Sequence, residues 1–174
     1  MKKTLLVLTM LTLTASVVMA GEMPAGYTLP KPSPELERIK SLVGQWTGTS
    51  VEKGESKPVT VSYQVTSGGS AVVETIDSGT SHEMVSVYHD KGGKLTLDHY
   101  CMLGNEPELS LKSSTGGSID LDMTPESHTL LASQMHMHSL SLAFGANEIT
   151  ETWTAWSPDG KAMGPCVFKL QKKA

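Results

Sequence analysis

Six histidines are the residues of this 174-residue sequence best suited to chemistry, and two of them, His136 and His138, alternate in the run MHMHSLSLAF. Alternate residues of a β-strand point to the same side, so this pair falls in line with Leu140 and Leu142. The same test aligns His99 with the leucines of KLTLDHYCML. An imidazole without a partner is costly inside an apolar core. We therefore expect the three rings to point inward and to share a ligand, a water network or a metal.

Neutral imidazoles two residues apart on one strand can bind a metal ion from the same side. We take His99, His136 and His138 as candidate metal ligands, with Cys101 or His82 as a further ligand. Zinc, copper or haem would suit such a set. The competing interpretation is that each ring is an interior residue with hydrogen bonds to Ser, Thr or the backbone. The methionines of the MHMH run could also bind copper from the opposite face, although methionine often serves as core filler.

A candidate ligand pocket follows from the residues that these patterns turn inward. Its predicted members are Trp46, Glu83, His99, Cys101, His136, His138, Phe144 and Trp153. Phe168 would add apolar wall, and Tyr88 or Tyr100 would help to orient a ligand.

Glu83 enters this pocket through the strand predicted at 82–89, both of whose faces are mixed. We take the face with Val85 and Val87 as the interior one, which brings Glu83 to one mouth of the fold. A carboxylate there could orient a histidine or accept a proton. The alternative is that Glu83 is a solvated rim residue. His128 is expected to lie exposed in a turn.

The elements that must position these side chains are strands. From Gln45 onward, short alternating runs are separated by Gly, Ser, Asn, Asp and Pro. The candidate strands are 45–52, 58–66, 70–77, 82–89, 94–102, 108–113, 117–123, 129–144 (broken along its length), 147–156 and 165–171. About ten strands with no helices between them favour an all-β fold, and closure into an antiparallel up-and-down β-barrel would remove exposed edges.

One short N-terminal helix is predicted before the strands, over 34–43. Ser33 can cap the free amides of its first turn, Pro34 suits the first helical position, and Gly44 can end it. The Pro-rich segment 21–32 ahead of it is expected to be an extended leader.

The helix leading into LVGQWTG, residues 42–48, resembles the G-x-W opening of the calycin superfamily, whose first strand carries a Trp that closes one end of a barrel. The segments GGSAVVET, HEMVSVYH, HYCMLGN and MHMH are similar to a group of uncharacterised bacterial secreted proteins of lipocalin-like type. The resemblance covers residues 35–172. It implies a small barrel with an internal cavity, closer to the nitrobindin-like barrels than to the lipocalins proper, and it brings no activity with it.

Residues 1–20 have the pattern of a secretory signal peptide, with two lysines near the start, an apolar run from Leu5 to Val18 and a small-x-small site. That run is shorter than the roughly 20 apolar residues that span a bilayer. We expect cleavage near Ala20 and a secreted, periplasmic protein with no stable membrane anchor.

Removal of that segment would leave 12 Lys and Arg against 18 Asp and Glu, a net charge of −6. The basic residues are scattered singly, whereas a nucleic-acid-binding protein needs a basic stripe, so nucleic acid is not an expected partner. Residues 33–174 suit a single domain. Cys101 and Cys166 could form a disulfide if their strands are neighbours, which the sequence leaves open.

The sequence contains no nucleophile elbow, phosphate-binding loop, dinucleotide-binding glycine pattern or metalloprotease helix. We therefore expect a binding protein that holds a small, partly apolar ligand in a barrel cavity with a His-rich patch. The alternatives are metal or haem binding through the same histidines, and an enzyme in which Glu83 and His99 act as acid and base.

Overall fold

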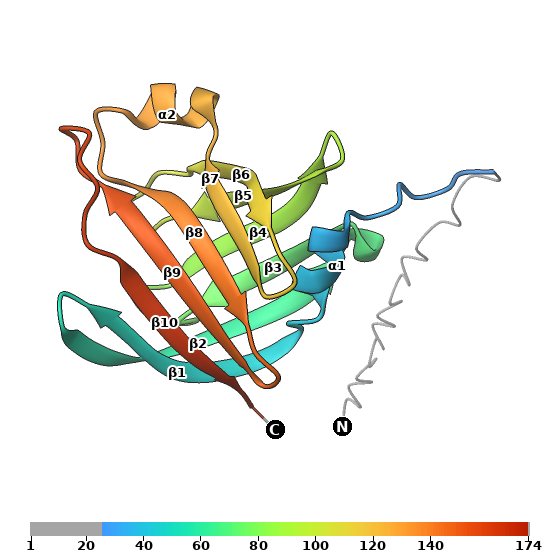
Figure 1. The fold of residues 1–174 in the computed structure, drawn as a ribbon, viewed down its shortest axis with the longest axis horizontal. Coiled ribbons are helices and arrows are strands. Elements are labelled where there is room, and N and C mark those ends of the chain that lie inside the picture. Colours follow the sequence, from blue (N-terminus) through green and yellow to red (C-terminus); the bar gives the residue numbers. More distant parts are fainter. Residues whose placement is uncertain (1–25, 174) are drawn as a thin grey trace, which may run out of the picture.

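Ten strands form one closed antiparallel barrel in the computed structural model, which describes residues 26–173 (Figure 1). The strands are β1 (Gly44–Glu52), β2 (Glu55–Thr66), β3 (Ala71–Ile76), β4 (Met84–Lys91), β5 (Lys94–Tyr100), β6 (Glu108–Ser114), β7 (Ser118–Met123), β8 (His136–Phe144), β9 (Glu148–Trp156) and β10 (Cys166–Lys172). Each strand pairs with its neighbours along the chain, and β1 pairs with β10 to close the sheet. The predicted all-β barrel is confirmed. The predicted signal peptide, 1–20, lies outside the described residues.

The short helix α1 (Pro34–Lys40) covers one end of this barrel, which we call the helix end. Ser33 caps it as predicted, because its Oγ accepts a hydrogen bond from the backbone N–H of Leu36 at 3.1 Å. The buried Leu36 and Ile39 side chains face the barrel, where α1 packs against β2, β3 and β4. The helix ends at Lys40, ahead of the predicted boundary.

Trp46 lies at the same end of the barrel, and two other residues of the LVGQWTG segment, Leu42 and Gly48, determine how this segment packs. Its indole is buried, and Nε1 donates a hydrogen bond to the carbonyl oxygen of Leu42 at 2.7 Å. Gly48, two residues further along β1, runs close to β10. A Cβ atom at this position would lie 1.8 Å from the carbonyl oxygen of Lys169, so only glycine allows the two strands to pair.

A second helix, α2 (Pro125–Leu131), corrects the prediction of a broken strand over 129–144. Thr124 caps α2 through a hydrogen bond from the N–H of Ser127, with proline at the first helical position. The strand β8 begins only at His136. Within residues 26–173, no helix is both long and apolar enough to cross a membrane.

The interior face of β4 is the opposite of the one predicted. Ser86 and Tyr88 are completely buried inside the barrel, so Val85 and Val87 lie on the outer face. The prediction assumed that the interior is apolar throughout. The Tyr88 hydroxyl instead donates a hydrogen bond to Glu74 at 2.9 Å inside the barrel, which makes burial of a polar residue favourable.

Candidate functional site

A cavity of about 580 Å³ lies inside the barrel at the end opposite α1, which we call the cavity end. Its lining is mainly apolar and rich in sulfur. Five of the six methionines in residues 26–173 line it, namely Met84, Met102, Met135, Met137 and Met163. The aromatic rings of Trp153 and Phe168 and the thiols of Cys101 and Cys166 complete much of the wall, and charged or polar groups such as Asp77 and His82 also line it.

Both cysteines of the described chain are free thiols, so the disulfide that the sequence left open is not formed here. Burial raises the pKa of the Cys101 thiol and of the Cys166 thiol, which keeps both protonated at neutral pH. The Cys166 sulfur lies 3.2 Å from the Ser50 hydroxyl. Protonated, partly buried thiols pack as small apolar groups and react slowly as nucleophiles at neutral pH.

His99 lies on the interior face of β5, as predicted, next to the cavity wall. Its ring centroid is 4.7 Å from that of Trp153, and its Nδ1 is 3.0 Å from the Ser86 hydroxyl. Burial lowers the pKa of His99 to about 4, so the ring is neutral at neutral pH. Among residues 26–173, Nε2 of this ring has no hydrogen-bond partner.

Behind Trp153 lies a pair of completely buried carboxyl groups, Glu74 on β3 and Glu151 on β9. The Tyr63 hydroxyl sits between them, 2.6 Å from Glu151 Oε1 and 3.2 Å from Glu74 Oε1. Trp153 Nε1 donates to Glu151 at 3.1 Å, and the Tyr88 hydroxyl donates to Glu74 at 2.9 Å. These five side chains form one polar network across the barrel interior.

The network requires one proton on the carboxyl pair. Tyr63 has a single hydroxyl proton, and the shorter distance assigns it to Glu151, which also accepts from Trp153. Burial, and then the charge of Glu151, hold the pKa of Glu74 well above its ordinary value. Burial also raises the pKa of Glu151. A hydrogen bond between the two carboxyl groups raises the pKa of Glu74 and lowers that of Glu151, so we assign the proton to Glu74 and the negative charge to Glu151.

Neither glutamate was among the residues predicted from the sequence. The alternation itself contained the signal, because Glu74 falls in line with Val72 and Ile76, and Glu151 falls in line with Ile149. The partners that make their burial acceptable come from other strands.

A β-bulge in β8 determines where the histidines of the MHMH run point. The ladder pairs Met137 with Ala155 and Leu140 with Trp153, with a register shift between Met137 and Ser139. His138 is therefore the extra residue, and the alternation reverses across it. Met137 points into the cavity, whereas His136 and His138 lie on the outer face of the barrel. This corrects the expectation that the two rings point inward.

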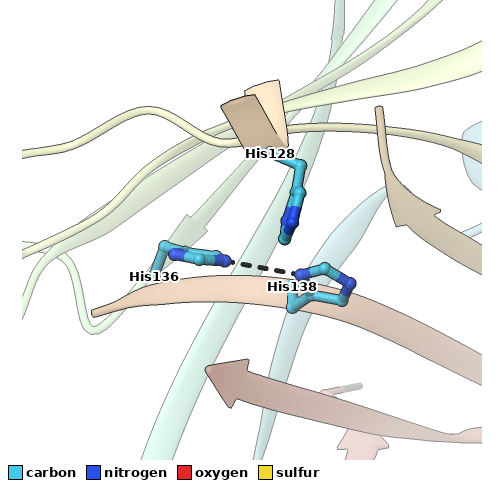
Figure 2. A group of neighbouring side chains, drawn as sticks. All are labelled: His128, His136 and His138. Carbon is cyan, nitrogen blue, oxygen red and sulfur yellow. Dashed lines mark hydrogen bonds between the residues drawn. The ribbon is translucent and has the colours of Figure 1, made fainter. Parts of the chain in front are cut away.

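His128, expected in an exposed turn, lies on α2 and approaches this pair (Figure 2). One nitrogen from each of His128, His136 and His138 lies within 4.8 Å of the others. His138 stacks on Trp156 with the ring centroids 3.8 Å apart, and His128 meets the same indole edge-on at 5.8 Å. His99 is not part of this group, because it lies inside the barrel.

The remaining residues of the predicted pocket divide between the two ends of the barrel. Cys101 and Trp153 line the cavity. Trp46 and Phe144 lie towards the helix end, where the Arg38 guanidinium is 4.4 Å above the Phe144 ring.

Glu83 does not reach the interior. It is exposed in the loop before β4, and its carboxylate accepts a hydrogen bond from the N–H of Gly79. The predicted acid–base pair of Glu83 and His99 is therefore not formed, since His99 is buried and bonded to Ser86.

Fold and site together define a closed ten-stranded antiparallel barrel with a sulfur-rich cavity at one end. Among solved structures, the chain is similar to Rv2717c from M. tuberculosis, with a TM-score of 0.53 and 13% sequence identity over 83% of this chain and 100% of that one. At this level of identity the likeness shows the fold alone. No protein-family model and no curated protein matches the chain.

Proposed function

We propose that this barrel is a binding protein that holds one small, mostly apolar molecule in the cavity lined by methionines. The observation that carries the proposal is the cavity itself. Its volume of about 580 Å³ falls within the range of roughly 300–1,000 Å³ that is typical of small-molecule sites. A closed antiparallel barrel is also a fold that holds a small ligand without exposing sheet edges.

The chemistry of the lining favours an apolar and somewhat irregular ligand. Methionine has three rotatable bonds and a polarisable thioether, so several of them can adapt to the shape of a guest. Trp153 and Phe168 supply flat apolar wall, and Asp77 and His82 supply polar contacts. A ligand with an apolar body and one polar group fits this arrangement.

The polar network behind Trp153 holds this ring of the cavity wall in a fixed orientation. Trp153 contacts the cavity with its ring and donates its N–H to Glu151, so its orientation is fixed from behind. His99 contacts the same ring. A wall residue held on two sides keeps its place whether or not a ligand is present, which lowers the cost of ordering the site on binding.

We also propose that the chain is a nitrobindin-like member of the calycin superfamily and that it acts outside the cytoplasm after cleavage near Ala20. The G-x-W segment at residues 44–46 and the pattern of residues 1–20 support these two proposals. N-terminal sequencing of the mature protein should begin at Gly21. An intact Met1 terminus on the exported protein would contradict the cleavage.

Titration with the apolar fluorescent probe N-phenyl-1-naphthylamine tests the binding function. Ala155 lines the cavity, and Thr152 on the same strand faces outward. The Ala155→Phe variant should fill part of the cavity and weaken probe binding by at least about tenfold, equivalent to about 1.4 kcal/mol. The Thr152→Phe variant is the matched control and should bind like the wild type. Equal affinities of the two variants would contradict the proposal.

Haem is one candidate guest, and an absorbance titration at the Soret band distinguishes it from other apolar molecules. His82 is the imidazole that lines the cavity, whereas His89 lies on the outer face, 3.0 Å from Asp98. A Soret shift that is lost in His82→Ala and kept in His89→Ala would identify haem as the ligand. Probe binding with no specific Soret shift would assign the site to another apolar molecule.

A further inference from the structure

The three histidines of the outer face form a compact group between α2 and β8, separate from the cavity. Figure 2 shows His128 reaching from the helix towards His136 and His138 on the strand. His136 is almost completely buried, and the His138 side chain is 15% exposed. Trp156 forms one side of the group through its contacts with His138 and His128. The imidazoles are therefore held by packing in a partly enclosed site.

The hydrogen bonds fix which nitrogens face each other. His136 Nδ1 lies 2.8 Å from the carbonyl oxygen of Gln134, which can only accept, so Nδ1 carries the proton and Nε2 carries a lone pair. That Nε2 is 3.4 Å from His138 Nδ1. His138 Nε2 is directed at the Asp122 carboxylate, with 3.8 Å between Nε2 and Oδ1.

This pattern leaves a conflict between the neutral rings. If His138 carries its proton on Nε2, where the Asp122 carboxylate favours it, then two lone pairs face each other across 3.4 Å. If it carries the proton on Nδ1, then this N–H can donate to His136 Nε2, but an unprotonated His138 Nε2 faces the negative Asp122 carboxylate at 3.8 Å. A cation between the two facing lone pairs removes the conflict and keeps the Asp122 contact, which is the usual arrangement of a metal-bound histidine with its outer carboxylate.

The third ring provides an independent observation. His128 Nδ1 is buried, and within residues 26–173 it has no hydrogen-bond partner. A buried polar atom without a partner is uncommon and costs roughly 1–3 kcal/mol. A metal ion bound by this Nδ1 and shared with the other two histidines would satisfy it.

The geometry points to a binding site for a divalent transition-metal ion, with zinc as the preferred ion, formed by His128, His136 and His138. Two nitrogen ligands of tetrahedral zinc, at about 2.0–2.1 Å from the ion, lie about 3.3–3.4 Å from each other. The observed His136–His138 distance of 3.4 Å has this value. His128 completes the set by a small movement of its ring, because its nitrogen is within 4.8 Å of both others.

Three imidazoles without a thiolate or a directly facing carboxylate suit zinc, and copper(II) is the main competitor. The fourth position is left to a water molecule. Asp122 would act through His138 rather than as a ligand, and its other oxygen is 2.8 Å from Lys112 Nζ.

The site also links α2 to the cavity wall. Met135 and Met137 line the cavity, while His136 and His138, between and after them, hold the proposed ion. A bound ion would therefore tie the start of β8 to α2 without entering the cavity. The inference does not depend on the proposed ligand-binding function.

Zinc titration of the full mature protein, free of any affinity tag, tests this site by calorimetry and by competition with a chromophoric chelator. One ion should bind per chain. His128→Phe keeps an aromatic ring against Trp156 but removes one ligand, and it should weaken binding by at least about 100-fold. Asp122→Asn should weaken it by about tenfold. His89 is a half-buried histidine on the outer face, and the His89→Phe variant is the control, which should bind zinc like the wild type.

X-ray absorption of the zinc complex should show nitrogen ligands at about 2.0–2.1 Å. In a parallel titration, the variants that weaken zinc binding should also weaken copper(II) binding. Circular dichroism and N-phenyl-1-naphthylamine binding check that His128→Phe still folds with its cavity intact. The inference is overturned if the wild type binds no zinc, if a folded His128→Phe variant binds it equally well, or if His89→Phe loses it to the same extent. None of these results bears on whether the cavity binds an apolar ligand.

Discussion

Met137 and His138 are neighbours in the sequence and face opposite sides of the barrel wall. Met137 lines the cavity, whereas His138 stacks on Trp156 outside it. The reversal at this point comes from the β-bulge, which adds one residue to β8 opposite β9. Strict alternation would place His138 with Leu140 inside the barrel. The single extra residue thus separates an apolar cavity from a group of histidines on the outer surface.

The single proton on the buried carboxyl pair, assigned to Glu74, predicts an unusual dependence of stability on pH. The pKa of Glu74 is raised in the folded state from an ordinary value of 4.5, mainly by burial and then by the charge of Glu151. Its contribution to stability is therefore fully present below about pH 4.5 and is lost as the pH rises through the folded-state pKa. Glu74→Gln keeps the hydrogen bonds without the titration. In urea unfolding, the free energy of unfolding of this variant should rise relative to that of the wild type as the pH is raised from 4.5 to 8. A difference that stays constant with pH would contradict the assignment of the proton to Glu74.

Tyr63→Phe should destabilise the fold, because it removes a donor from a buried charge. Glu151 would lose its shortest hydrogen bond and keep those from the Trp153 N–H and the Glu74 carboxyl group, and the loss of a hydrogen bond to a charged group costs about 1.5–3 kcal/mol. Tyr27→Phe is the control, since Tyr27 is 57% exposed. Urea unfolding at neutral pH measures both variants, and a cost no larger than that of the control would argue against a charged Glu151.

Gly48→Ala should disrupt the closure of the barrel between β1 and β10. The added Cβ would lie 1.8 Å from the Lys169 carbonyl oxygen, so the strands must separate, at a cost of about 3 kcal/mol or more. Gly116→Ala is the control, because a Cβ there meets open space. Thermal unfolding followed by circular dichroism compares them. Similar melting temperatures would show that the strands do not approach as described.

The two thiols report on occupation of the cavity. Cys101 and Cys166 both line it, so a bound apolar molecule should shield them from alkylation. Iodoacetamide labelling followed by mass spectrometry should be slowed several-fold by saturating N-phenyl-1-naphthylamine in the wild type, and much less in Ala155→Phe. Labelling rates that do not respond to the probe would place it elsewhere.

Local patterns were sufficient to predict the barrel and α1. The alternation in β5 correctly turned Leu95, Leu97 and His99 inward, and Ser33 with Pro34 marked the start of the helix. Each of these features depends on the element's own residues, so no knowledge of the neighbouring strands was needed.

Features that depend on contacts between elements were not predicted. The bulge in β8 leaves no distinct signal in MHMHSLSLAF, and the inward orientation of Tyr88 depends on Glu74 from β3, the neighbouring strand. The helix α2 is different, because Thr124 and Pro125 repeat the cap-and-proline signal that located α1. Recognition of that signal would have placed His128 on a helix.

Native mass spectrometry of the protein purified from the cells that make it tests directly whether the cavity binds a small apolar molecule. The wild type and the Ala155→Phe variant are compared in the same preparation conditions. We predict a noncovalent adduct of one small organic molecule on the wild type that is absent or strongly reduced on Ala155→Phe, whose phenyl ring would occupy its place. Identical spectra of the two proteins, with the same adduct on both or none on either, would contradict it.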